Sequence, residues 1–119
     1  MADHPYVNDV LLVGRLSGDP LLKTLPSGDL ILTWRLVVER PPGVGHRTTR
    51  KVVDTLNCVS FDGRLRDIAQ EWRHGDMLEV SGAVRRRFWR TGSTYEIAVE
   101  RAQPCTQRPV DGGDAVPDD

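Results

Sequence analysis

Alternation of apolar and polar side chains with a period of two is the feature that most restricts the fold of this chain. Between Leu30 and Glu39 one row is apolar and consists of Leu32, Trp34, Leu36 and Val38. Side chains of a strand alternate between the two faces of a sheet, so this row predicts a strand with Trp34 in the core. A strongly apolar run predicts a strand over 10–16 (continuing to 25 beyond a bend), and further strand patterns cover 54–61, 77–90 and 94–102.

One segment departs from this alternation. Leu65, Ile68, Ala69 and Trp72 recur at i, i+3, i+4 and i+7, which predicts a short amphipathic helix with Trp72 buried. Glycines interrupt the two long strands, and Gly14 favours a bulge or a sharp bend. Five strands with one helix between the third and fourth is the arrangement of the oligonucleotide/oligosaccharide-binding (OB) fold, a Greek-key barrel. Periodicity alone establishes only an all-β domain, so a sandwich also remains open.

The composition is that of one small domain with an acidic end. The chain has 119 residues, of which 39% are hydrophobic. Residues 1–108 carry all 16 Lys and Arg against 13 Asp and Glu, whereas 109–119 carry four Asp and no base. A mildly basic body therefore precedes an acidic tail. We expect the barrel domain over 1–103 and a short disordered tail over 104–119, which is rich in Pro, Gly and Asp.

Several functional classes find no support in the sequence. Apolar runs fall short of the roughly 20 residues that span a bilayer, and the N-terminus lacks a signal pattern, so we expect a cytoplasmic protein without membrane contact. Cys58 and Cys105 make neither a disulfide scaffold nor a metal-ligand set, and we expect no metal and no cofactor. His4, His46 and His74 have no nucleophile or paired carboxylate at a suitable spacing, so we expect no enzyme.

The fourth predicted strand carries the strongest functional pattern. Arg85, Arg87 and Trp89 share the row that should face water, whereas Phe88 falls on the other row and is expected in the core. Arginines can pair with phosphates, and a flat ring beside them can stack on a base. This combination predicts a surface that binds single-stranded nucleic acid.

Other cations add to this candidate site. Arg35 lies on the polar row of the second predicted strand, and Arg90 follows Trp89 at the end of the fourth. A loop rich in Pro and Gly joins the second strand to the third and carries Arg47, Arg50 and Lys51. Such a loop is either a solvated hairpin tip or a phosphate contact, and the sequence leaves both open.

Three segments match the motifs of a known family at compatible spacing. They are Asn8–Leu16 followed by Asp19-Pro20, then Leu25–Gly28, and then Gly75–Gly82 followed by Val84-Arg85. Through them, residues 7–102 resemble the bacterial single-stranded DNA-binding protein family. The resemblance implies an OB barrel, usually assembled as a homotetramer, that binds single-stranded DNA by stacking bases on aromatic rings and holding phosphates with basic side chains.

The resemblance also assigns roles to individual positions. Trp89 and Phe61 match the stacking residues of the family's fourth and third strands. Two other stacking positions are not aromatic here, because the third-strand tryptophan falls near Thr55 and the second-strand aromatic near Pro41 or Pro42. Stacking contributes about 1–3 kcal/mol per base, so the loss of two platforms predicts affinity lower by an order of magnitude or more.

The tail and the small aromatic set leave more than one function open. The chain ends at Asp119 without the aromatic tip through which the family recruits replication and repair proteins, which argues against recruitment by the tail. We expect non-catalytic, largely sequence-independent binding of single-stranded DNA in replication, recombination or repair, at the bacterial nucleoid. The alternative is an OB-fold protein-interaction or replication-restart accessory module with weak nucleic-acid binding. RNA binding also remains open, because stacking platforms accept either nucleic acid.

Overall fold

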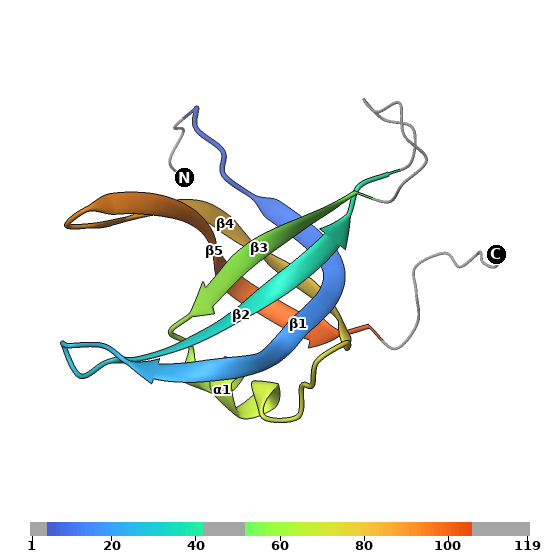
Figure 1. Ribbon diagram of the computed structural model, residues 1–119, viewed down its shortest axis with the longest axis horizontal. Helices are drawn as coiled ribbons and strands as arrows, with labels where there is room; N and C mark the ends of the chain where they lie inside the picture. Colours follow the sequence, from blue (N-terminus) through green and yellow to red (C-terminus); the bar gives the residue numbers. More distant parts are fainter. Residues whose placement is uncertain (1–4, 42–51, 106–119) are drawn as a thin grey trace, which may run out of the picture.

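The alternating segments form five strands that close into a barrel (Figure 1). The computed structural model describes residues 5–41 and 52–105. In this part of the chain the elements are β1 (Val10–Thr24), β2 (Leu30–Glu39), β3 (Val53–Ser60), α1 (Gly63–Ala69), β4 (Met77–Trp89) and β5 (Gly92–Pro104). The strand order around the closed barrel is β1-β2-β3-β5-β4. The predicted OB barrel with its helix between the third and fourth strands is confirmed, and a sandwich is excluded.

β1 closes the barrel because it pairs with two strands. Its first part, Val10–Arg15, runs antiparallel to β4, and its second part, Arg15–Thr24, runs antiparallel to β2. The strand curves strongly between these partners (Figure 1). Gly14 lies just before the exchange of partners, where a Cβ atom would collide with the Val37 carbonyl oxygen. The bend is thus where the sequence predicts it, but the register break of β1 with β2 lies later, between Ser17 and Leu21.

Gly82 allows a similar close approach in β4. The register of β4 with β5 shifts between Ser81 and Gly82, so this strand pair contains a bulge. A Cβ atom at Gly82 would collide with the carbonyl oxygen of Ala98. A short parallel pairing of β3 with β5 completes the barrel, in which Cys58 lies beside Ile97 and Val59 beside Ala98.

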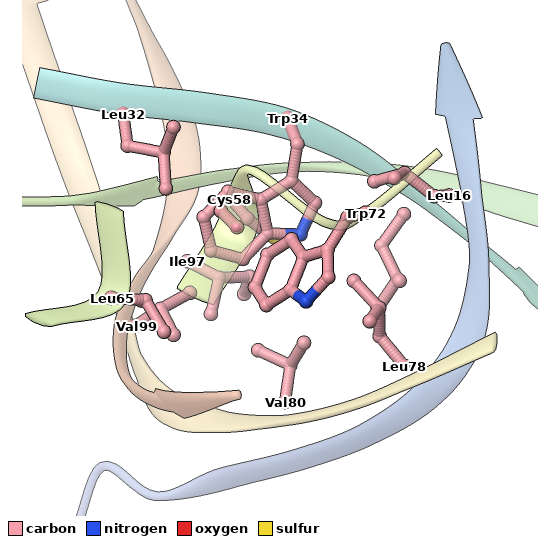
Figure 2. Packing of buried hydrophobic residues seen from close by; sticks show 12 residues of the cluster. Leu16, Leu32, Trp34, Cys58, Leu65, Trp72, Leu78, Val80, Ile97 and Val99 are labelled. Carbon is pink, nitrogen blue, oxygen red and sulfur yellow. The ribbon is translucent and has the colours of Figure 1, made fainter. Parts of the chain in front are cut away.

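Two tryptophans occupy the centre of the core (Figure 2). The rings of Trp34 and Trp72 meet edge to face, with centroids 5.3 Å apart and planes at 78°. They are surrounded by aliphatic side chains from the strands and from α1, among them Leu16, Leu65, Leu78, Val80 and Ile97. Both tryptophans are buried as the sequence predicts. Neither buried indole N–H has a hydrogen-bond partner among the described residues, so the contact is held by packing.

The helix is shorter than its periodicity predicts. Asp62 caps its N-terminus by accepting a hydrogen bond from the Arg64 N–H, and α1 ends at Ala69. Trp72 therefore lies beyond the helix, and Ile68, predicted on the apolar face, is 48% exposed. A helix of two turns buries only a narrow stripe, here Leu65 and Ala69, and the chain then turns to bring Trp72 into the barrel.

The chain ends differ slightly from expectation. β5 begins at Gly92 and extends to Pro104, which pairs with Leu78, so the first residue of the expected tail belongs to the barrel. The rest of the expected disordered tail lies almost entirely outside the described residues. Within those residues, no helix has the length and apolar character needed to cross a membrane.

The bulge at Gly82 makes a prediction about stability. Gly82→Ala should lower the free energy of unfolding by about 2 kcal/mol, because the added methyl group meets the Ala98 carbonyl in a packed sheet. Urea denaturation followed by circular dichroism measures the change. Gly92→Ala is the matched control, since its Cβ atom would lie 3.5 Å from the Trp89 ring, an ordinary contact. Equal midpoints for the two variants would contradict this account of the bulge.

Candidate nucleic-acid interface

The outer side of the barrel bears a groove of about 720 Å³. Its floor is formed by outward-facing side chains of β2 and β3, namely Thr33, Arg35, Asn57 and Val59. One wall comes from β1 around the register break at Ser17–Leu21, and from Lys23. The other wall comes from the hairpin of β4 and β5, which extends away from the barrel (Figure 1). We call this extension, residues 84–96, the arm.

The arm is a two-stranded ribbon with two distinct faces. Arg85 pairs with Glu96, Arg87 with Thr94 and Trp89 with Gly92 in the β4–β5 register, so these residues share the face that we call the front. Trp89 is 52% exposed. Its ring lies against Gly92, whose lack of a side chain leaves this position open to the indole. The front face therefore presents a half-exposed ring beside arginines.

The charges of the groove favour an anionic ligand. Its lining holds three cations, Lys23, Arg35 and Arg87, and two carboxylates, Asp19 and Glu96. Arg87 lies 3.6 Å from Glu96, whose side chain is only 13% exposed. Lys23 and Arg35 form no ion pair with another described residue. Two cations are thus free to meet phosphates, while the carboxylate in the arm is neutralised by its neighbour.

The other carboxylate of the groove, Asp19, helps to position the β1 wall. The Asp19 carboxylate accepts a hydrogen bond from the backbone N–H of His74 at 3.0 Å. His74 Nδ1 in turn accepts one from the Gly18 N–H at 2.7 Å, where Gly18 has a positive φ of 82°. These two bonds fix the irregular part of β1 against the loop that precedes β4.

The structure brings together only some of the predicted site residues. Trp89, Arg87 and Arg35 line the groove, on the arm and on β2. Arg85 shares the front face of the arm but does not line the groove, and Arg90 lies exposed in the turn at the arm's tip. Phe61 is also exposed, but it follows β3 next to α1, where its carbonyl accepts a hydrogen bond from Arg66. Arg47, Arg50 and Lys51 lie outside the described residues.

Sequence reasoning missed seven polar residues of the groove lining: Ser17, Asp19, Lys23, Thr33, Asn57, Thr94 and Glu96. Asn57, Thr94 and Glu96 lie on polar rows that could have signalled an outward face. Lys23 could not be placed, because its position depends on how β1 pairs with β2 after the irregularity at Gly18.

The prediction that Phe88 lies in the core is wrong. Its side chain is 70% exposed. Phe88 does share a row with Leu78 and Val80, which are fully buried, but β4 leaves the barrel before it reaches Phe88. Alternation assigned the correct face of the strand, and nothing in the described structure covers that face beyond Val84.

An exposed ion pair joins the ends of β2 and β3. The Arg40 guanidinium contacts the Asp54 carboxylate with both Nη2 and Nε, at 2.9 and 3.1 Å. This contact holds the pKa of Asp54 below its usual value. The Arg40 N–H also donates to the Val52 carbonyl. Arg40 and Val52, which lie on either side of the undescribed residues 42–51, are therefore hydrogen-bonded neighbours at the ends of β2 and β3.

Comparison with known proteins identifies the family. The model of the single-strand binding protein family matches residues 7–105. The chain belongs to this family. Among its relatives, single-stranded DNA-binding protein A of Bacillus subtilis is 28% identical over 97 residues, which are 82% of this chain and 55% of that protein. The single-stranded DNA-binding protein of Oceanobacillus iheyensis is 31% identical over 112 residues, 90% of this chain and 68% of that protein. This family member thus spans about half to two thirds of those relatives.

A solved structure has the same fold. The Plasmodium falciparum SSB in complex with ssDNA superposes with a TM-score of 0.67 over 87% of this chain and 96% of that one, at 22% identity. At this identity the likeness supports the OB barrel itself. Within the part of the chain that the structure describes, no group of three or more His, Cys, Asp or Glu side chains could hold a metal ion.

Cys58 lies under the groove and reports on its integrity. Its side chain is fully buried opposite Trp34, and burial raises the pKa of the thiol to about 12. At neutral pH its thiolate fraction is therefore about three orders of magnitude below that of an ordinary cysteine. In the native protein iodoacetamide should modify Cys105 and spare Cys58, whereas in urea it should modify both. Mass spectrometry of the peptides measures this, and rapid native labelling of Cys58 would show that the barrel opens beneath the groove.

Proposed function

We propose that this protein binds single-stranded DNA, without catalysis and with little sequence preference, in bacterial replication, recombination or repair. One observation carries the proposal: the half-exposed Trp89 ring stands beside Arg87 at the wall of a groove whose floor and far wall supply Arg35 and Lys23. A planar ring stacks on any base, and cations hold phosphates irrespective of sequence. The relatives from B. subtilis and O. iheyensis carry the name single-stranded DNA-binding protein, which agrees with this chemistry.

The small number of aromatic rings suggests how strongly the protein binds DNA. Near two positions where the family resemblance expects aromatic rings, this chain has Thr55 and Pro41 or Pro42, of which Thr55 and Pro41 are exposed. Fewer stacking rings leave a larger share of the binding free energy to phosphate contacts. Because those contacts release counterions, we propose that binding is weaker and more salt-dependent than a full set of rings would give.

Assembly and location form part of the same proposal. We propose a homotetramer in the bacterial cytoplasm, bound at the nucleoid, as the family resemblance implies. Val7, which precedes β1, and Leu11, at its start, are large exposed apolar side chains that could be covered by a second copy.

Replacing the ring tests the placement of the site. Trp89→Ala should weaken binding of oligo(dT) by about 5-fold to 100-fold, the equivalent of one lost stacking contact, with the fold unchanged. Fluorescence anisotropy of a labelled oligonucleotide at fixed salt measures the affinity. Trp89→Phe, which keeps a ring, should recover part of the loss. If Trp89→Ala binds as tightly as the parent, the groove is not the site.

The Arg87–Glu96 pair allows a test in which one substitution should raise the affinity for DNA. Glu96→Gln should raise the affinity by up to about fivefold, because it removes a negative charge from the groove and releases Arg87. Arg87→Gln should lower the affinity and flatten the salt dependence by about 0.7 in log K against log [salt]. Glu100→Gln and Arg101→Gln are matched controls, since both residues are exposed and lie outside the groove lining. Equal effects of Glu96→Gln and Glu100→Gln would contradict a local role.

A titration with the parent protein separates the alternatives. A saturable complex with long oligo(dT) at near-physiological salt supports the proposal. The absence of such a complex would favour an OB-fold protein-interaction module. A competing RNA oligonucleotide that displaces the DNA at equal concentration would show that the protein does not distinguish the two.

A further inference from the structure

The face of the arm opposite Trp89 carries its own cluster of an arginine and two aromatic rings. The Arg86 guanidinium carbon lies 5.0 Å from the centroid of the Phe88 ring and 5.4 Å from that of Tyr95. Arg86 Nε also donates a hydrogen bond to Ser93 Oγ at 3.1 Å. We call Arg86, Phe88 and Tyr95 the rear cluster, of which Phe88 also lines the groove. Register confirms the face, because Arg86 pairs with Tyr95 and Phe88 with Ser93.

The fold does not account for these rings. Phe88 is 70% exposed and Tyr95 is 62% exposed, although both belong to the row that fills the barrel core further along β4 and β5. Exposing two large rings side by side costs solvation free energy, which a soluble domain normally avoids by burying them or using them in binding. The Arg86 guanidinium contacts both rings, so cation–π attraction favours their position beside it.

The charge of the arm indicates what these rings meet. Residues 84–96 contain four arginines and a single carboxylate, Glu96, which lies on the front face against Arg87. Arg86 has no carboxylate partner among the described residues, so the rear cluster is a cationic surface. A second copy of the arm would bring the same positive charge to it, which disfavours contact between two arms. An anionic ligand with flat apolar groups fits both the charge and the rings.

We propose that the rear cluster is a second base-stacking site, so that one single-stranded DNA molecule passes around the arm and contacts both faces. This inference rests on the proposed function. The arm is one sheet thick, and its tip is the two-residue turn Arg90-Thr91. Arg90 lies exposed at this tip, between the two faces, where it can hold a phosphate as the DNA crosses from Trp89 to the rear cluster.

Oligonucleotide length distinguishes the two faces. An oligo(dT) of about 6 nucleotides can occupy the front groove alone, whereas one of about 16 reaches both faces, lengths within the range that a single OB fold binds. Tyr95→Ala should bind the longer DNA at least about fivefold more weakly than the parent and the shorter DNA equally well, because Tyr95, unlike Phe88, does not line the groove. Trp89→Ala should weaken both. Tyr6→Ala, which removes an exposed ring elsewhere, is the control and should weaken neither.

Each outcome decides between the proposals. If the parent binds neither DNA, the proposed function fails. If the parent binds both and Tyr95→Ala binds the longer DNA as tightly as the parent, the rear cluster is not a stacking site and the proposed function stands. A lower mass of Tyr95→Ala in sedimentation without DNA would show that this ring joins copies of the chain, which also overturns the inference.

A crosslinking experiment on the unaltered protein avoids any effect of substitution on folding. Irradiation with 5-bromodeoxyuridine-containing DNA should crosslink both faces when the DNA has about 16 nucleotides, and the front face when it has about 6. Trypsin cleaves after Arg87, Arg90 and Arg101, which separates residues 88–90 from residues 91–101 that contain Tyr95. Crosslinks to Tyr95 with the longer DNA support the inference. Crosslinks to Trp89 without any to Tyr95 at either length would overturn it.

Discussion

The double pairing of β1 is the constraint on which the rest of the structure depends. A strand that pairs with β4 over its first half and with β2 over its second half must bend sharply, and Gly14 permits this because no side chain opposes the Val37 carbonyl. Closure leaves β1 and the β4–β5 hairpin on opposite sides of the outer face of β2 and β3. The groove is therefore a product of barrel closure, and its polar side chains only determine what it can hold.

Closure also separates two uses of the same strand. Along β4, one row of side chains packs around the tryptophan pair inside the barrel and then continues into the arm, where there is no core to enter. Side chains of the opposite row face outward along the barrel, and in the arm they form the groove wall. A single long strand thus supplies hydrophobic packing at one end and two ligand-facing surfaces at the other, without a loop dedicated to either.

The sequence predicted what depends on local pattern. Alternation located the later strands, Trp34 in the core and the outward face of Trp89, an apolar run located the first strand, and the helical period placed Trp72 in the core. Alternation placed Phe88 in the core wrongly, since it specifies a face and says nothing about where a strand leaves the barrel. It also missed Lys23 and Glu96, whose positions depend on strand register and on contacts between segments distant in sequence. Ile68 shows the same limit for a helix that ends early.

The thinness of the arm has a consequence for kinetics. A two-stranded ribbon without a packed layer is marginally stable in water, so the arm opens locally at a lower free-energy cost than the barrel. Its own side-chain contacts, Arg86 with two rings and Arg87 with Glu96, keep it closed in the free state. A ligand bound around the arm would therefore dissociate at a rate governed by the fraying of this hairpin, while the barrel stayed folded.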